Sequence, residues 1–133
     1  MYGDLTVSVL AKGMQGLSRR LESTSRNIAN ANTPAYARRK VSFEEELREV
    51  VNGPSKLPMA VTSRTHIPSG PLSVGEVIPA ETRVPDEPYR LDGNAVDPER
   101  EMAVLTETRM SYSALSRFLA RKGAMLRYVI GGN

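Results

Sequence analysis

Few side chains in this sequence are of the types that catalyse reactions or hold metals. His66 is the only histidine, its neighbours Thr65, Ile67 and Pro68 offer no acid, and the chain has no cysteine. A zinc site or a histidine-dependent hydrolase needs several such groups within reach of one another. A glycine-rich loop with phosphate-binding spacing is also missing. The sequence therefore predicts a protein that is not an enzyme and that binds no metal or cofactor.

Two charged clusters invite a binding interpretation. Arg38–Lys40 could grip phosphate or an acidic membrane surface, but three bases without interleaved aromatic residues usually form a solvated face or pair with nearby acids, here Glu44–Glu46. The three consecutive glutamates fan around a helix, so they do not converge as a catalytic pair. Because acids and bases are interleaved and the net charge is only +3, we expect no nucleic-acid partner.

Composition limits the fold that must position these residues. The 133 residues include two phenylalanines and no tryptophan, and hydrophobic residues make up 40%, so a thick self-sufficient core is not expected. The absence of cysteine excludes disulfides. Lys12, Arg19 and Arg20 interrupt the apolar residues near the N-terminus, and no run reaches the length of a membrane span. We expect no direct membrane insertion and no cleavable export signal.

Apolar residues recur at steps of three and four near both ends of the chain. Such steps average 3.5 residues, the spacing that keeps one side of a helix against a partner helix. The pattern predicts a mainly α fold whose long N- and C-terminal helices pair as a coiled coil, around a proline-rich, partly extended or β middle region. Thr24, Thr108 and Lys122 interrupt the pattern, either as register-setting residues or as tolerated imperfections. The predicted assembly seam consists of Leu10, Met14, Leu17, Leu21, Ile28, Leu105, Tyr112, Leu115, Leu119, Leu126 and Val129.

Helix-ending and helix-starting residues divide the chain into four segments. Residues 1–33 form an N-terminal coiled-coil helix, expected from Leu5 to Ala31 and ended before Pro34. Residues 34–51 form a turn and a short acidic helix with Ser42 as its N-cap. Residues 52–96 form a proline-rich linker or a small β subdomain. Residues 97–133 form the C-terminal coiled-coil helix, ending near Ile130.

Two further local signals refine this division. Asp97 suits an N-cap and Pro98 the first helical position, where a missing N–H group costs nothing. In the middle region, 59–62 and 74–78 are short β-prone pieces between glycine and proline breakers. These pieces either pair as a small sheet or hairpin or remain extended.

The segment Asn27–Tyr36, with sequence NIANANTPAY, resembles the signature that follows the first helix in bacterial flagellar axial proteins, which include rod, hook and hook-associated subunits. Gly93–Asp97, followed by Glu101 and Met102, resembles the matching C-terminal signature. Signatures at both ends make the resemblance specific, and the C-terminal helix is most similar to that of the proximal members of the flagellar basal-body rod protein family. The signature residues are Asn27, Asn30, Asn32, Thr33, Pro34, Tyr36, Asp97, Glu101 and Met102.

One signature position departs from the family. Ala35 stands where the family usually has glycine. If that glycine serves a positive φ angle, Ala35 must either adopt another backbone geometry or accept strain.

The resemblance implies a structural subunit of the rod, polymerising through its terminal helices for motility. It implies as partners other copies of the chain, rod and adaptor proteins of the FlgC and FliE types, and the flagellar type III export apparatus. The implied location is the periplasm-spanning rod of the basal body. The alternatives are another axial rod subunit, such as the FlgC type, and a soluble coiled-coil adaptor.

Overall fold

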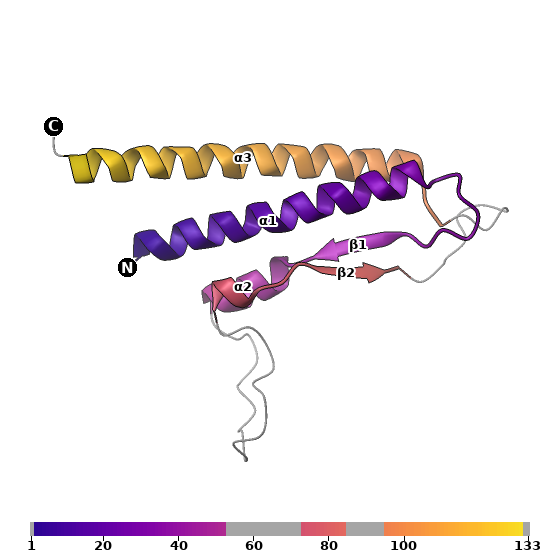
Figure 1. Cartoon of the computed structure of the whole chain (residues 1–133), viewed down its shortest axis with the longest axis horizontal. Helices are drawn as coiled ribbons and strands as arrows, with labels where there is room; N and C mark the ends of the chain where they lie inside the picture. Colours follow the sequence, from indigo (N-terminus) through magenta and orange to yellow (C-terminus); the bar gives the residue numbers. More distant parts are fainter. Residues whose placement is uncertain (1, 53–72, 85–94, 132–133) are drawn as a thin grey trace, which may run out of the picture.

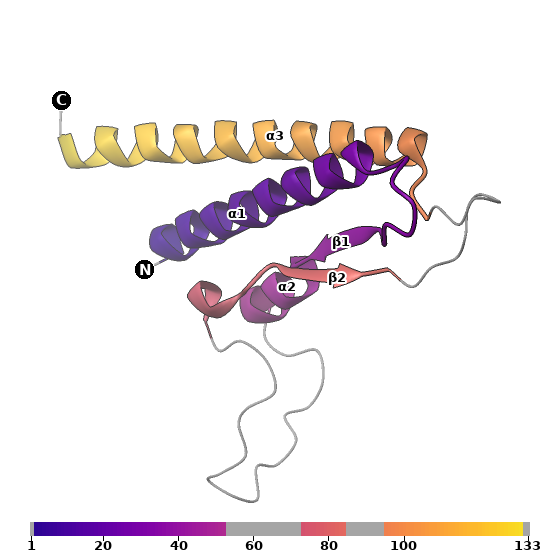
Figure 2. The same ribbon diagram turned by 45° about the vertical axis from the view of Figure 1, so that its right-hand side comes forward.

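The structure, a computed structural model, describes residues 2–52, 73–84 and 95–131. The order of elements is helix α1 (Tyr2–Ala29), strand β1 (Arg39–Ser42), helix α2 (Glu44–Asn52), 3-10 helix η1 (Val74–Glu76), strand β2 (Ala80–Arg83) and helix α3 (Pro98–Gly131). Figures 1 and 2 show α1 and α3 as an antiparallel pair, with α2 and the two strands on the far side of α1 from α3. The predicted mainly α fold with two long terminal helices is confirmed.

The two long helices pack along the spacing that the sequence predicts. Leu17 and Thr24 of α1 and Leu105 and Thr108 of α3 are buried. A side chain at Gly13 would place its Cβ 3.2 Å from Leu115 Cδ1, so the helices approach closely there. In both views they diverge toward the end that carries the last residues of α3.

A small hydrophobic core lies where α1 meets β1, with Tyr112 and Leu115 of α3 packed against it. Val41, Phe43 and Val77 are buried against Leu17. The Phe43 ring reaches α1 because Gly16 has no side chain, since a Cβ built there would lie 2.5 Å from the ring. The glycine that weakens the helix locally therefore makes room for the largest apolar residue of this core.

Strands β1 and β2 form an antiparallel ribbon in which Val41 pairs with Glu81 and Ser42 with Ala80. A two-stranded ribbon is marginal by itself and gains stability by packing its buried side on a helix. The β-prone interpretation of residues 74–78 is wrong in detail. Residues 74–76 form η1, which buries Val74 and leads to the buried Val77, and the strand begins only at Ala80. The other β-prone piece, 59–62, lies outside the described residues, as does His66.

The prediction that Ser42 caps the acidic helix is wrong. Ser42 belongs to β1, and α2 begins at Glu44 after Phe43, whose carbonyl accepts a hydrogen bond from the Leu47 amide at 3.0 Å. Serine is the better N-cap by local preference. Pairing with Ala80 and burial of Phe43 override that preference.

The ends of the long helices follow the predictions more closely. Helix α1 spans Tyr2–Ala29 instead of Leu5 to Ala31. At the start of α3, the Asp97 carboxylate accepts hydrogen bonds from the Glu99 amide at 3.0 Å and the Arg100 amide at 3.4 Å. The predicted N-cap and the Pro98 helix start are confirmed.

Candidate functional site

The most thoroughly bonded side chain is the fully buried amide of Asn27, near the end of α1. Its Nδ2 donates to the Arg39 carbonyl at 2.7 Å and to Glu101 Oε2 at 2.9 Å. Its Oδ1 accepts from the Arg39 amide at 3.0 Å and from the Tyr36 hydroxyl at 3.2 Å. Both donors and both acceptor positions of the amide are therefore used. Asn27 joins α1, the turn that follows it, β1 and α3.

Glu101 is the second centre of this network. It is 1% exposed, and its Oε1 accepts a charge-assisted hydrogen bond from Arg38 Nε. A buried carboxylate is costly unless it is paired and hydrogen-bonded, and here Arg38 and Asn27 provide both. We call Asn27, Tyr36, Arg38 and Glu101 the polar clasp.

The polar clasp corrects one sequence interpretation. Arg38 neither lies on a solvated face nor pairs with Glu44–Glu46, since its partner is Glu101 on α3. Glu44 instead forms an ion pair with Arg20 of α1. The two residues of the Arg38–Glu101 pair are 63 positions apart, so spacing along the chain gave no signal for it.

The turn between α1 and β1 contains most of the remaining signature residues. The Asn30 side chain donates to the Arg26 carbonyl at 2.9 Å, and the Thr33 hydroxyl donates to Asn30 Oδ1 at 3.2 Å. Ala35 has a φ of 58°, so this alanine accepts the left-handed conformation that favours glycine. Three other signature residues are exposed, namely Asn32, Pro34 and Met102. The signature therefore divides into residues whose side chains are hydrogen-bonded and residues that are exposed, and Thr33 is both.

Arg20 links α1 to β1, to Phe43 and to α2. Its guanidinium donates to the Val41 carbonyl at 3.0 Å, lies 5.1 Å from the centre of the Phe43 ring, and pairs with Glu44. Partial burial alone would raise the pKa of the Glu44 carboxyl. The hydrogen bond from Arg20, together with backbone hydrogen bonds, outweighs burial and lowers that pKa below its ordinary value.

Glu81 links β2 to α1 and to β1, a set of contacts that the sequence did not predict. Its carboxylate accepts a hydrogen bond from the Ser23 hydroxyl at 3.1 Å and lies 3.8 Å from Arg26 and 3.7 Å from Arg39. Ser23 and Glu81 are 58 positions apart, so no local pattern could have paired them.

The opposite end of the helix pair is apolar and exposed. Of the predicted seam, Leu17 and Leu105 are buried, whereas Leu126 is 38% and Val129 72% exposed. Other large apolar side chains in the last part of α3 are also exposed: Phe118 60%, Met125 61%, Tyr128 80% and Ile130 83%. Within one copy, the seam therefore has a buried inner part and an exposed outer part. The remaining seam residues, Leu10, Met14, Leu21, Ile28, Tyr112, Leu115 and Leu119, are partly buried.

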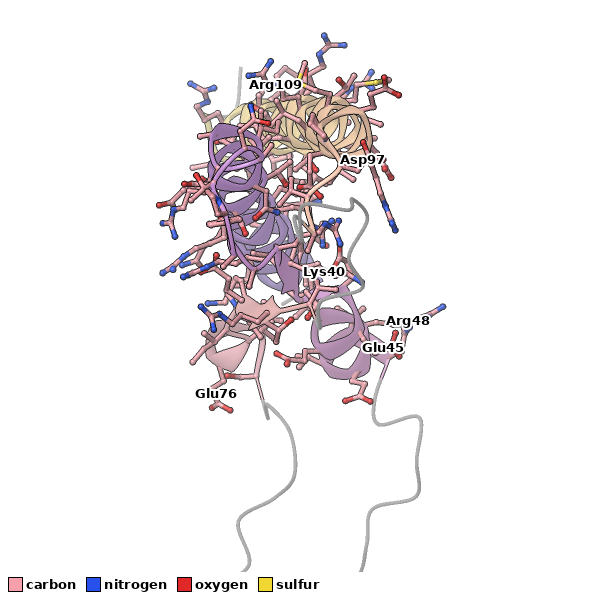
Figure 3. The ribbon with its side chains drawn as sticks, turned by 90° about the vertical axis from the view of Figure 1, so that its right-hand side faces the viewer. Lys40, Glu45, Arg48, Glu76, Asp97 and Arg109 are labelled. Carbon is pink, nitrogen blue, oxygen red and sulfur yellow. The ribbon has the colours of Figure 1, made fainter. Side chains whose placement is uncertain are left out.

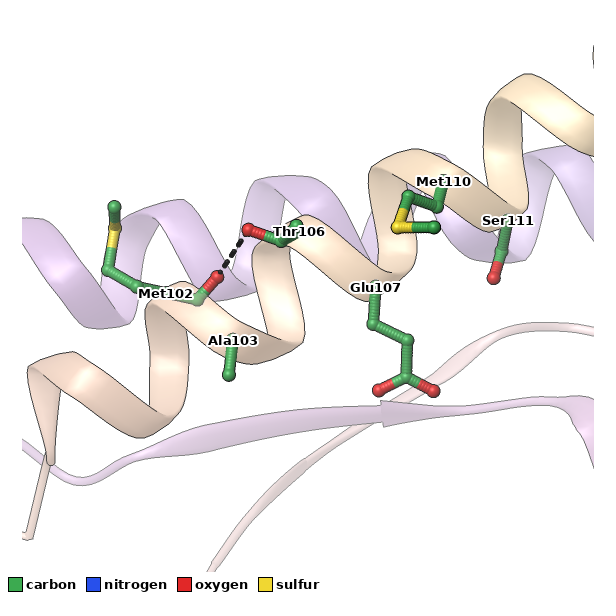
Figure 4. Close-up of a pocket in the computed structure, with 6 residues that line it drawn as sticks. All are labelled: Met102, Ala103, Thr106, Glu107, Met110 and Ser111. Carbon is green, nitrogen blue, oxygen red and sulfur yellow. Dashed lines mark hydrogen bonds between the residues drawn. The ribbon is translucent and has the colours of Figure 1, made fainter.

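Three further properties of the described residues concern hollows, metal binding and membrane crossing. A shallow hollow on α3 is lined by residues of that helix alone, including Met102, Glu107 and Met110, and Figure 4 shows no converging set of reactive groups there. Across the described residues no three His, Cys, Asp or Glu side chains gather where a metal ion could bind. Of the helices in the described part of the chain, none has the length and apolar character to cross a membrane.

Comparison with curated proteins gives one consistent result, although no protein-family model matches the chain. The chain is 33% identical over 121 residues to the flagellar basal body rod protein FlgB of Escherichia coli K12, covering 87% of this chain and 86% of that protein. It is 35% identical to FlgB of Salmonella typhimurium over the same coverage, and 28% identical to FlgB of Bacillus subtilis over 96% of this chain and 94% of that protein. The chain belongs to the FlgB family of flagellar basal body rod proteins.

Proposed function

We propose that this chain is a structural subunit of the proximal part of the flagellar rod and that it polymerises through its terminal helices. The observation that carries the proposal is the exposed apolar end of α3, formed by Phe118, Met125, Leu126 and the segment 128–130. Exposed apolar side chains gathered at one end of a helix mark an interaction site, because their burial is favourable by about 25 cal/mol per Å². A subunit that binds its neighbours through α3 would cover these side chains.

The predicted seam then has two tasks. Its inner residues, such as Leu17 and Leu105, hold α1 against α3 within one copy. Its outer residues, Leu126 and Val129, contact neighbouring subunits. The assembly role of the seam is thus assigned mainly to the outer part.

The proposed partners are other copies of the chain and other rod and adaptor proteins, of the FlgC and FliE types. Membership of a family named for the basal-body rod supports this structural role. The proposed function is non-catalytic and uses no cofactor. We also propose export by the flagellar type III apparatus without a cleavable signal, with the rod as the final location. A nucleic-acid partner and membrane insertion form no part of the proposal.

The test is complementation of a motile bacterium that lacks its own copy of this subunit. We expect the full chain to restore swimming and rods in isolated basal bodies, whereas Leu126→Ser combined with Val129→Ser should restore neither. Ser113→Ala combined with Ser116→Ala, two exposed positions on the same helix, is the matched control and should behave as wild type. Normal rods in the Leu126/Val129 variant would contradict the assembly role of the outer seam. A purified chain that forms only a discrete dimer, and never a rod, would support a coiled-coil adaptor instead.

A further inference from the structure

The last part of α3 has an unbalanced charge. From Thr108 to Asn133 the chain contains no acidic residue, and its charged residues there are all basic: Arg109, Arg117, Arg121, Lys122 and Arg127. Within the described residues none of these bases forms an ion pair, although ion pairs occur elsewhere on α1, β1, α2 and α3. The exposed end of α3 is therefore both apolar and electropositive.

One of these bases, Arg121, shares a helix face with apolar residues. Phe118, Arg121, Met125 and Tyr128 follow one another at steps of three and four, so they form a stripe beside the seam and distinct from it. All four side chains are exposed. A helix that lies on a membrane separates a basic face from an apolar face. This stripe instead combines basic and apolar side chains on one face. Such a face suits a protein partner that presents acidic and apolar side chains together.

Helix α2 has that composition. Its nine residues include Glu44, Glu45, Glu46 and Glu49 against the single base Arg48. None of its residues is buried, and Val51 is 45% exposed. At 1.5 Å per residue, α2 is about 12 Å long from first to last residue, and the stripe from Phe118 to Tyr128 about 15 Å, so the two surfaces match in length.

Within one copy these two surfaces cannot meet. Helix α2 lies on the far side of α1 from α3 in Figures 1 and 2. In Figure 3, Glu45 and Arg48 of α2 lie at the opposite side of the molecule from Arg109 of α3. A contact between α2 and the end of α3 must therefore join two copies. When each copy uses its two surfaces on two different neighbours, the contact is head-to-tail, which produces rings or open helical filaments.

We propose that the acidic helix α2 of one copy docks on the stripe Phe118, Arg121, Met125 and Tyr128, flanked by Arg117, of the next copy. Charge complementarity selects a second copy as the occupant. The proposal rests on the rod-subunit function proposed above and deepens it, because it names both faces of one subunit contact. It gives α2 a role that its small contribution to the core of one copy does not provide.

Reciprocal charge reversal tests the contact in the purified full chain. Arg117→Glu with Arg121→Glu, and separately Glu45→Lys with Glu49→Lys, should each weaken self-association at least about tenfold, because two favourable pairs become repulsive. Combining all four changes should restore most of the loss. Sedimentation measures the association, and circular dichroism checks that each variant keeps its helices. Glu99→Lys with Glu107→Lys, two exposed acids near the start of α3, is the matched control and should leave association unchanged.

The outcomes separate this proposal from the rod function. Single reversals that associate as wild type, or a combined variant no better than either single reversal, would overturn the α2–α3 contact while motility complementation by the wild-type chain still supports the rod function. Failure of the wild-type chain to complement would overturn the rod function itself. Wild-type binding to phosphatidylserine vesicles that is lost in the Arg117/Arg121 variant, with self-association unchanged, would assign the stripe to a membrane surface and overturn the proposal.

Discussion

The two ends of the α1–α3 pair differ in how their side chains are covered: polar groups are buried at one end, and apolar groups are exposed at the other. At one end, Asn27 is fully buried and Glu101 is 1% exposed, and their hydrogen bonds are satisfied within a single copy. At the other end, Val129 and Ile130 are 72% and 83% exposed, although their burial would be favourable. The comparison indicates that the polar clasp completes the fold of one copy, whereas the apolar end of α3 stays uncovered there, and we propose that assembly covers it.

The largest effect on the single copy is expected from breaking the polar clasp. Glu101→Ala would leave Arg38 largely buried without its counter-ion and remove an acceptor from Asn27. Losing one partner of a buried pair typically costs about 3–5 kcal/mol. We expect the free energy of unfolding, measured by denaturant titration with circular dichroism, to fall by that amount or the variant not to fold. Glu107→Ala, an exposed acid on the same helix, should change it by less than about 0.5 kcal/mol. Equal stability of the two variants would contradict the role of the polar clasp.

A smaller loss is expected at the core beneath α1. Gly16→Ala would bring a Cβ to 2.5 Å from the Phe43 ring, so the ring must shift. Overpacking of this kind costs about 1–3 kcal/mol, from which the helix preference of alanine subtracts up to about 1 kcal/mol. Gly123→Ala is the matched control, because nothing lies within 4 Å of its Cβ, and it should stabilise the chain. Thermal melts of both variants should therefore shift in opposite directions, and a stabilised Gly16→Ala would refute the close packing.

How much the sequence could predict follows from the range of each interaction. Steps of three and four located both long helices, and Asp97 located the start of α3, because these signals lie within a few residues. The resemblance marked Asn27 and Glu101 as signature residues, but not that they touch, since they are 74 positions apart. Ser42 failed as a cap because its strand pairing with Ala80 was invisible to local rules. Long-range pairings decided the corrections at Ser42 and Arg38.

For the exposed end of α3, the sequence predicted the positions of the seam residues but not their exposure. Periodicity placed Leu126 and Val129 on the same seam as Leu105. It could not show where the partner helix stops covering that seam, because coverage depends on how α1 and α3 diverge in space. The division of the seam into a buried inner part and an exposed outer part emerges only from the burial of each side chain.

A modest gain in stability is expected beside the polar clasp, at the strained turn. Ala35 has a φ of 58°, which costs a non-glycine residue about 1–2 kcal/mol. Ala35→Gly removes that strain but adds freedom to the unfolded chain, worth about 0.4–1 kcal/mol. We expect a net stabilisation of up to about 1.6 kcal/mol in thermal or denaturant unfolding. Ala37→Gly, at a position without a positive φ, should be neutral or destabilising, and a similar gain in both variants would rule out strain at Ala35.

The smallest effect on a single copy is expected at the apolar end of α3. Tyr128→Ser combined with Ile130→Ser changes side chains that are 80% and 83% exposed, so little packing is lost within one copy. In dilute solution the free energy of unfolding should stay within about 0.5 kcal/mol of wild type. Leu105→Ser, on the buried part of the same helix, should cost about 2–5 kcal/mol, because it removes packed apolar volume. If the Tyr128/Ile130 variant lost as much stability as Leu105→Ser, these side chains would already be packed within one copy. The contrast between the end with the polar clasp and the apolar end of α3 would then fail, because the end of α3 would belong to the fold of the subunit and not to its assembly.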